Sequence, residues 1–440
     1  MSGPTVSGPT VSGPTDGGPP EGSPTDGGPA EGSPRVSSPT TGGPGEAGVL
    51  PSSGPHRLLR ELGEADRDGA YALGTLAFGG DPTAPVPAAR AGRRSWGVFE
   101  GDRLVATAAV RDDEQWWGGQ PVRMAGIAGV AVHPDARGRG AAGQLVHALI
   151  EHAHQARQSI SVLFPTAPGI YRSLGWEVVG ALEETRLAVS DLREVAAPSH
   201  VQLRSAGPED LPALARLWRE HGSATNGQLT RTGPCFSDRP LRVLEADVVT
   251  LAEVAGEAVG YLSYDRGRGY GPEGQLQVNE LVAAGAEATR ALLHALGTWD
   301  SVVSSVRWRG PTDDLGLVLR RPVPPPYESR PWMLRVLDAP AAVAARGYPS
   351  GPALEVSFTL VDPQVPSQAG AWGLKVRNGR GRLERVDARP DLPVLQARGL
   401  ALLYAGVDDA RVRRAGLLEG ELPELAAAFA GPRPQLLDYF

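Results

Sequence analysis

The chain has 440 residues, a hydrophobic fraction of 41% and a formal net charge of −7 at pH 7. Its length predicts about two to four domains, because domains usually hold about 100–200 residues. Its acidic balance, with a pI near 5.7, argues against a nucleic-acid partner, since nucleic-acid-binding domains usually carry a basic stripe. No apolar run approaches the ~20 residues that cross a bilayer, and no signal peptide follows Met1. We therefore expect no membrane partner and a cytoplasmic location.

Residues 1–54 form a low-complexity arm in which Gly, Pro, Ser and Thr dominate, as in "SGPTVSGPTVSGPT". Such a composition supplies too few apolar side chains to build a core. The arm is therefore predicted to be disordered.

Residues 55–198 are predicted to form a first α/β domain. Leu58, Leu59 and Leu62 recur at helical spacing, which predicts a helix at its start. An antiparallel meander follows, with turns at residues 100–102 and 118–119. The remaining pattern predicts, in order, a strand at 126–132, a helix at 140–157, a strand at 160–166, a short helix at 169–175 and a strand at 176–189.

Residues 199–329 repeat this order, with a helix in "GPEDLPALARLWREHG", a hairpin in "VVTLAEVAGEAVGYLSYDRG", and then strand, loop and helix in "GQLQVNELVAAGAEATRALLHALGTW". A repeat of this length indicates a duplicated domain, not a solenoid. After a Pro-rich linker at Arg320–Pro331, residues 330–440 carry strands followed by helices, which is an α+β pattern.

The chain ends in "QLLDYF", so that Tyr439 and Phe440 are its last two residues. Chain ends usually fray unless they are tied down. Two terminal aromatics without a polar tail predict that the C-terminal carboxylate rests on buried structure.

The stretch "VAVHPDARGRGAAGQLV" carries the most informative pattern. Gly138, Gly140 and Gly143 spell G-x-G-x-x-G between a predicted strand and a predicted helix, which alone is the dinucleotide-binding fingerprint. Two features weigh against that interpretation: a meander precedes the loop, and the acidic residue expected about twenty positions later is missing. A glycine-rich helix start without any ligand is a further interpretation.

The pattern Arg137-x-x-Gly140-x-Ala142 resembles the pyrophosphate loop of the Gcn5-related N-acetyltransferases, or GNAT proteins. Small residues let backbone N–H groups approach a diphosphate at a helix N-terminus, where the helix dipole favours negative charge. Arg137 and Arg139 add counter-charge. The preceding strand can pair its backbone with the amides of the pantetheine arm, as an added strand would.

The three-part organisation resembles the Eis (enhanced intracellular survival) acetyltransferase family over residues 55–440. The resemblance implies tandem α/β GNAT folds with mixed central sheets flanked by helices, the first catalytic (55–198) and the second degenerate (199–329). It implies a sterol-carrier-protein-like α+β domain at 330–440 that delivers the C-terminus. It also implies acetyl transfer from acetyl-CoA to primary amines of aminoglycoside or lysine type, without a metal, in a homohexamer.

The same resemblance implies roles for individual residues. Tyr171, on the predicted short helix, matches the proton donor, and Phe440 matches, by being last, the residue whose terminal carboxylate accepts a proton. The implied cofactor-binding residues are Val130, Ala131, Val132, Arg137, Gly138, Arg139, Gly140, Ala141, Ala142, Gly143, Thr166 and Ala167. The second repeat reads "LVAAGAEATRALL" at the loop position, so we expect no cofactor there and a role in walling the substrate channel.

Weaker patterns allow two interpretations each. His147, Glu151 and His154 share a helical face, which is a metal stripe or a solvated or packed face; we favour the second, since no cysteine or aspartate cluster supports a metal. Trp116 and Trp117 line a substrate pocket or form a strand-end pair.

Cys235 is the only cysteine, which excludes an intramolecular disulfide and fits a reducing compartment. It has no visible histidine partner, so we interpret it as a small buried or loop residue.

A second class of function is a catalytically inactive scaffold of the same domains that binds a lipid or a protein partner. Stabilisation by coenzyme A separates this scaffold from an enzyme.

Overall fold

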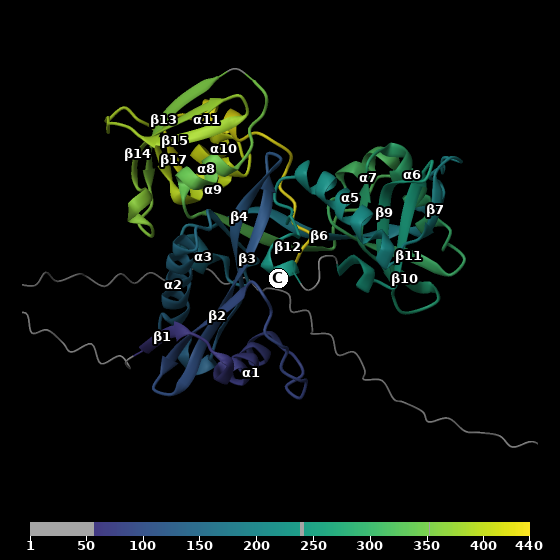
Figure 1. The fold of residues 1–440 in the computed structure, drawn as a ribbon, viewed down its shortest axis with the longest axis horizontal. Coiled ribbons are helices and arrows are strands. Elements are labelled where there is room, and N and C mark those ends of the chain that lie inside the picture. Colours follow the sequence, from purple (N-terminus) through teal and green to yellow (C-terminus); the bar gives the residue numbers. More distant parts are fainter. Residues whose placement is uncertain (1–56, 238–241, 352) are drawn as a thin grey trace, which may run out of the picture. The chain divides into compact units, whose positions relative to one another are not determined.

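The computed structural model describes residues 57–237, 242–351 and 353–440 (Figure 1). The predicted disordered arm, residues 1–54, lies outside the described residues. The described residues form one compact unit. No helix among the described residues is long and apolar enough to cross a membrane.

The first part of the chain folds as a meander followed by alternating helices and strands. Its elements are β1 (Arg57–Glu61), α1 (Arg67–Phe78), β2 (Arg93–Glu100), β3 (Arg103–Trp117), β4 (Gln120–Val132), α2 (Ala141–Gln155), β5 (Ile160–Leu163), α3 (Pro168–Ser173), β6 (Glu177–Ala188) and α4 (Val189–Arg193). The two predicted turns join β2 to β3 and β3 to β4, which confirms the meander.

The helix predicted from Leu58, Leu59 and Leu62 is wrong. This segment forms strand β1, which pairs antiparallel with β2 and places Leu58 opposite Phe99. Three leucines within five residues suit either a helix turn or an edge strand, and here pairing with β2 decides in favour of the strand. The first α-helix begins only at Arg67.

The second part repeats the first, as predicted. Its elements are β7 (Gln202–Ser205), α5 (Leu211–Ser223), β8 (Val248–Val254), β9 (Glu257–Arg266), β10 (Gly271–Ala283), α6 (Ala286–Gly297), β11 (Val303–Arg309) and α7 (Asp313–Val318). Strands β10 and β11 pair in parallel, as β4 and β5 do in the first repeat.

The two repeats share one sheet of 12 strands, ordered β1-β2-β3-β4-β5-β12-β6-β11-β10-β9-β8-β7. Strand β12 (Glu328–Val336) follows the second repeat in sequence, yet it lies between β5 and β6 of the first. Strand β6, in turn, pairs with β11 of the second repeat. We expected the last domain to begin at residue 330, but the chain leaves the shared sheet only after Val336.

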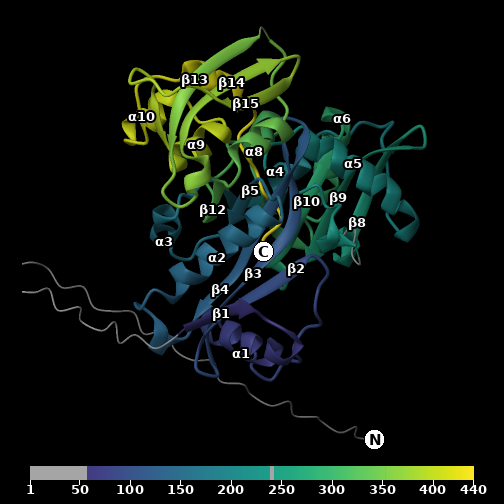
Figure 2. The same ribbon diagram turned by 60° about the vertical axis from the view of Figure 1, so that its left-hand side comes forward.

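The last part of the chain forms a separate sheet with helices, visible in Figures 1 and 2. Its elements are α8 (Ala339–Ala345), β13 (Leu354–Val361), β14 (Gly370–Arg377), β15 (Arg380–Arg385), β16 (Val394–Gln396), α9 (Ala397–Tyr404), α10 (Asp409–Arg414), β17 (Leu418–Glu419) and α11 (Pro423–Ala428). The strand order is β15-β14-β13-β16-β17, which is the predicted α+β architecture.

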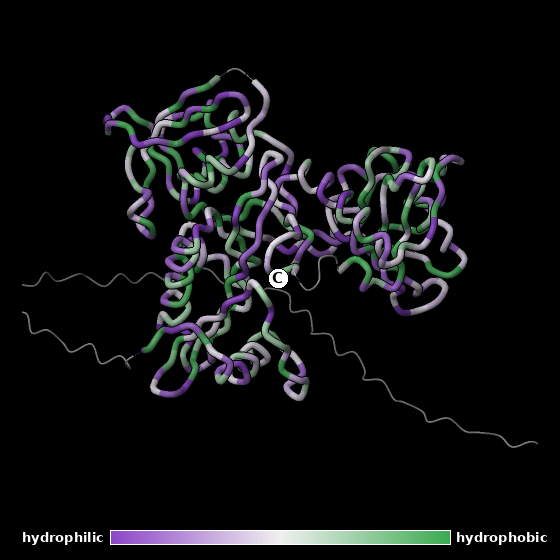
Figure 3. Tube along the Cα trace, viewed as in Figure 1, coloured by the Kyte–Doolittle hydropathy of each residue, from purple (hydrophilic) through white to green (hydrophobic). Residues whose placement is uncertain are grey.

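Helix α2 covers the first half of the large sheet with one apolar face. Leu145 and Leu149 are fully buried in the core of that half, and the helix alternates between hydrophobic and hydrophilic segments in Figure 3. His147, Glu151 and His154 are exposed on the opposite face. They therefore form the solvated face that we favoured over a metal stripe.

A buried ion pair ties the shared sheet to the last domain. Arg335 on β12 and Asp362, just after β13, both have fully buried side chains. Nη2 of Arg335 donates to both carboxylate oxygens at 2.9 Å, and Nη1 donates to the carbonyl of Leu174 at 2.5 Å. One guanidinium thus links three segments that are far apart in the sequence.

We predict that Arg335→Ala lowers the free energy of unfolding by about 3–5 kcal/mol, because it leaves the Asp362 carboxylate buried without its partner. The matched control is Arg382→Ala, which removes an exposed arginine paired with Glu384 and is expected to cost at most about 1 kcal/mol. Urea unfolding followed by circular dichroism measures both. Equal effects would contradict a structural role for the buried pair.

Candidate active site

The candidate site lies where strands β4 and β5 separate. The two strands pair only over residues 124–126 of β4, and β5 ends at Leu163 while β4 continues beside β3 to Val132. A β-bulge places Gly129 and Val130 together opposite one residue of β3. Such bulges bend a strand and redirect its side chains. Beyond Gly126 the sheet therefore opens into a wedge.

A cavity of about 630 Å³ fills this wedge. It is lined by Tyr171 and by every residue predicted to bind the cofactor except Arg139. The guanidinium of Arg139 instead donates to Glu100 at 3.2 Å. The lining also includes residues that the sequence did not indicate, namely Ala77, Phe78, Ala136, Val146 and Ile170. Phe78 and Ile170 are 52% and 42% exposed and add apolar surface to the cavity lining.

On one side of the cavity, residues 138–143 at the N-terminus of α2 form a cradle, and the helix has no side-chain cap there. Gly140 precedes the helix with a φ of 82° and makes no side-chain cap, and the first turn, residues 141–144, is uncharged. A Cβ atom at Gly138, Gly140 or Gly143 would meet no heavy atom of the described residues within 4 Å. Free N–H groups at a helix start, with Arg137 beside them, suit an anion such as a diphosphate.

Tyr171 faces the same cavity from α3. Its ring is only 6% exposed and packs edge-on against Trp176, with the ring centroids 6.2 Å apart. Burial raises the pKa of Tyr171 to about 12. The hydroxyl therefore stays protonated throughout the physiological range.

Helix α3 is fixed to its surroundings by Glu177, at the start of β6. The Glu177 carboxylate accepts from Arg172 of α3 at 2.8 Å and from Arg398 of α9 at 2.8 Å. Only 5% of Glu177 is exposed, and burial by itself raises the pKa of its carboxyl. The two arginines and the backbone N–H of Val178 lower this pKa by more, so the net shift is downward. The carboxylate thus holds the Tyr171 helix against the last domain.

The C-terminal residue reaches the first repeat, which the sequence alone did not establish. In Figures 1 and 2 the chain ends beside β3. The Phe440 ring lies 4.9 Å from Cζ of Arg111 and 5.8 Å from the ring of Phe164, centroid to centroid. A Cβ atom on Gly126 would come within 3.0 Å of the ring. Phe440 is therefore seated at the residue where β4 and β5 part.

Glycines clear the path of the chain toward that seat. A Cβ atom on Gly180 would lie 2.9 Å from the carbonyl oxygen of Pro434, and one on Gly227 would lie 2.8 Å from that of Gln435. Any larger residue at these positions would displace the tail. The missing side chains of these glycines thus leave room for the backbone of the C-terminal tail, residues 434–440.

Arg111 and Asp113 form a partly buried pair beneath the Phe440 ring. Nε of Arg111 donates to Asp113 at 2.7 Å. Burial raises the pKa of Asp113 although Arg111 opposes this shift. Cys235 lies in a short turn near this pair and donates to the carbonyl of Gly92 at 3.3 Å. Burial and Asp113 raise its pKa to about 12, so it is a protonated loop residue and not a nucleophile.

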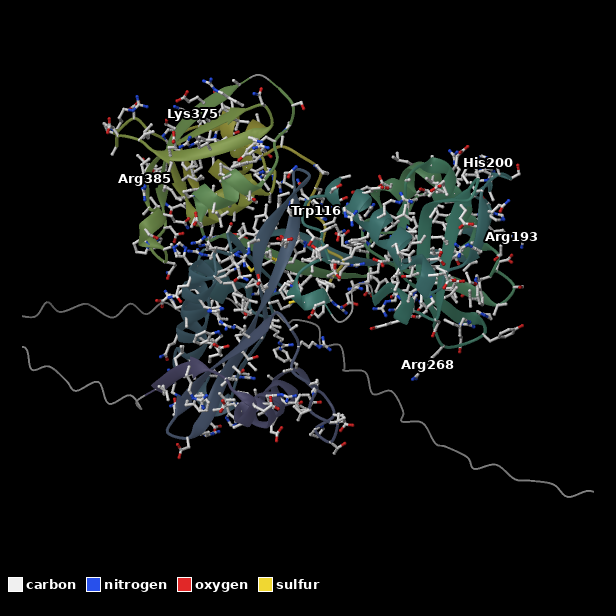
Figure 4. The ribbon with its side chains drawn as sticks, in the orientation of Figure 1. Trp116, Arg193, His200, Arg268, Lys375 and Arg385 are labelled. Atoms are coloured by element: carbon white, nitrogen blue, oxygen red, sulfur yellow. The ribbon has the colours of Figure 1, made fainter. Side chains whose placement is uncertain are left out.

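Sequence reasoning missed Arg111 and Gly126, two of the residues that contact Phe440. Gly126 carries a signal, because a glycine inside a strand often marks the close approach of another group. Arg111 carries no sequence signal that distinguishes it from other arginines in strands. Trp116 and Trp117 prove to be a strand-end pair: Trp117 is fully buried, and Trp116 lies at the end of β3 against Gly222 of α5 (Figure 4).

Family models match three successive parts of the chain. Residues 59–179 match an acetyltransferase (GNAT) domain, residues 227–336 match a second acetyltransferase (GNAT) domain model, and residues 339–437 match a sterol carrier protein domain. The predicted order of domain types is thereby confirmed. No curated protein sequence matches the chain.

Several solved structures share the fold. A GCN5-related N-acetyltransferase from Kribbella flavida is 35% identical, with a TM-score of 0.75, over 88% of this chain and 98% of that chain. A GCN5-related N-acetyltransferase from Anabaena variabilis ATCC 29413 is 22% identical, with a TM-score of 0.77, over 88% of this chain and 100% of that chain. Eis1 from Mycobacterium abscessus is 22% identical, with a TM-score of 0.68, over the same shares.

The Kribbella flavida relative, 35% identical over most of both chains, settles the class: the chain belongs to the GCN5-related N-acetyltransferase family and is an N-acetyltransferase. Its two GNAT domains followed by a sterol carrier protein domain form the arrangement that the sequence shares with the Eis family. Eis1 has the same fold.

Proposed function

We propose that this chain transfers the acetyl group of acetyl-CoA to a primary amine, with Tyr171 as general acid and the terminal carboxylate of Phe440 as general base. One observation supports this most strongly. The cavity that Tyr171 shares with the pyrophosphate-loop residues is lined by Val130–Val132 of β4, and the Phe440 ring is seated against Gly126 of the same strand. The acid, the cofactor site and the chain end thus all lie along β4.

GNAT domains use acetyl-CoA, and the lining of the cavity suits it. The cradle of residues 138–143 would hold the diphosphate, with Arg137 as counter-charge. Backbone groups of Val130–Val132, which β5 leaves free, would pair with the pantetheine amides. Thr166 and Ala167 would close the cavity beside α3. When bound, the cofactor supplies a thioester whose acetyl carbon is open to attack by an amine.

Each protein group then moves a proton or fixes a charge. The Phe440 carboxylate accepts the proton of the attacking amine. A free α-carboxyl has a pKa of about 3.3–3.7, and desolvation of a carboxyl raises that value toward the range of a useful base. A backbone N–H near Val130–Val132 stabilises the charge that develops on the acetyl oxygen. Tyr171 donates its proton to the departing thiolate, since its own pKa of about 12 keeps it protonated beforehand.

The acceptor belongs to the amine class that the Eis resemblance implies, an aminoglycoside or a lysine-like amine. A chain with a net charge of −7 attracts such cations. The homohexamer and the cytoplasmic location stay predictions.

We predict that coenzyme A raises the melting temperature, because a ligand at 100 times its Kd adds about 2.7 kcal/mol to stability. Ala142→Glu is expected to abolish the shift, since its carboxylate would repel the diphosphate although an acid stabilises a helix start. The control is Gln144→Glu, which adds the same charge to the same turn outside the cavity lining. Differential scanning fluorimetry measures all three proteins. No shift in the wild type would favour the inactive scaffold.

Extension of the chain beyond Phe440 tests the proposed base. Two added glycines move the carboxylate away from Gly126, and we expect kcat to fall about 10²–10⁴-fold, the usual contribution of a general base. Binding of coenzyme A should stay near normal, because its cradle lies on α2. An extension of equal length at Met1 is the control. Unchanged turnover in a thiol-release assay would refute a role for the terminal carboxylate.

Replacement of Tyr171 by phenylalanine removes the proposed acid while keeping its packing against Trp176. We expect a loss in kcat of about 10²–10⁴-fold with coenzyme A affinity retained. Because the pKa of Tyr171 is raised to about 12, its deprotonation cannot produce a fall in wild-type kcat below about pH 10. A kcat profile from pH 6 to 10 in both proteins checks this, and an alkaline fall near pH 8 that disappears in Tyr171→Phe would contradict it.

A further inference from the structure

The tail that carries Phe440 is held by a segment of the second repeat, residues 226–231. The backbone N–H of Gln435 donates to the carbonyl of Asn226 at 2.8 Å, and Nδ2 of Asn226 donates to the carbonyl of Pro432 at 3.3 Å. The backbone N–H of Leu437 donates to Oε1 of Gln228 at 3.2 Å. The tail thus receives directional hydrogen bonds as well as apolar contacts.

The opposite edge of the same segment binds the first repeat. The backbone N–H of Trp116 donates to Gln228 at 2.9 Å, and that of Gly227 donates back to Trp116 at 2.8 Å. The N–H of Thr230 donates to Glu114 at 2.9 Å. Residues 226–231 therefore lie between β3, which carries Arg111, and the tail. Through these hydrogen bonds, the segment fixes the chain end relative to the first repeat.

The segment ends in Arg231, which makes an ion pair with Asp438, two residues before Phe440. Nε of Arg231 lies 3.2 Å from each carboxylate oxygen of Asp438. Its Nη1 lies 3.0 Å from Glu280 of β10, and its Cζ lies 3.5 Å from the ring of Trp218. The side chains of Arg231, Asp438 and Glu280 are only 11%, 19% and 6% exposed.

The charges in this cluster favour the docked tail. Burial lowers the pKa of Arg231, but Asp438 and Glu280 outweigh it and raise the pKa overall, so the guanidinium stays charged. The planar fork of arginine bridges two carboxylates in a fixed geometry, which lysine does not reproduce. A displaced Asp438 would leave Arg231 with one anion in place of two. The cluster therefore resists release of the tail.

We propose that Arg231 is a positioning residue for the reaction: by holding Asp438, it fixes the terminal carboxylate two residues further on. The second repeat then contributes to catalysis by holding the proposed base in position. This inference rests on the proposed role of Phe440. Two residues span at most about 7 Å of extended chain, so the Asp438 contact lies close enough to the carboxylate to fix its position together with the ring contacts of Phe440. A misplacement of about 1 Å can cost 10²-fold in rate.

Asp438→Asn and Arg231→Lys test the proposal in the full-length enzyme. Asp438→Asn leaves the Arg231–Glu280 pair intact, and Arg231→Lys keeps the charge, so both variants should fold. We expect each to lower kcat about 10–100-fold while the Kd for coenzyme A stays unchanged. The double variant should lose little more than the worse single one, because both changes remove the same contact.

Release of the tail has a direct readout that does not depend on activity. Carboxypeptidase digestion followed by intact mass should remove Phe440 and Tyr439 faster from both variants than from the wild type. The matched control is Arg204→Lys. Arg204 also bridges two carboxylates in the second repeat, Asp210 and Glu253, and has no contact with the tail. This control should keep the wild-type kcat and digestion rate.

The outcomes separate this inference from the proposed function. If extension beyond Phe440 abolishes turnover but both variants keep the wild-type kcat, the positioning role is wrong and the base stands. If the extended chain turns over normally, the base is wrong and the positioning role falls with it. An equal loss in Arg204→Lys would show that the second repeat is merely destabilised, which also overturns the proposal.

Discussion

The placement of β12 between β5 and β6 is the constraint on which the rest of the structure depends. This strand comes from the end of the second repeat, so its pairing fuses two sheets into one and fixes the second repeat against the first. It also sets the starting point of the last domain, because α8 begins at Ala339, three residues after Val336. Arg335 on the same strand then binds Asp362 and Leu174, which fastens the last domain beside the Tyr171 helix.

After Val336 the chain forms the last domain, and its C-terminal tail then returns to the shared 12-stranded sheet. The tail passes Gly180 and Gly227 and ends at Gly126, where missing side chains leave room for it. The site is therefore assembled from both ends of the folded chain. The loop and Tyr171 belong to the first repeat, whereas Phe440, the residue proposed to accept the proton, follows the last domain in the sequence.

This division explains what could be read from the sequence. The glycine-rich loop at residues 137–143 and the helix that carries Tyr171 are local signals, because each lies within a short stretch of the chain, and the structure places a helix start and a short helix there as expected. The β1 segment was misread because edge pairing, not local periodicity, decides a short apolar stretch. Gly126 and Arg111 were missed because their partner is more than 300 positions away in the sequence. Arg139 was expected to add counter-charge at the loop, yet its guanidinium donates to Glu100 of β2.

The two repeats keep the same strands but differ in the charge at the helix that follows the parallel pair. Helix α2 begins with uncharged residues beside Arg137, whereas α6 carries Glu287 in its first turn. An acid there stabilises the helix but repels a diphosphate, so the second helix start is poorly suited to the cofactor. In the second repeat, Glu280 of β10 instead pairs with Arg231, which also pairs with Asp438. The duplicated fold thus replaces a site for an anionic ligand with one for its own chain end.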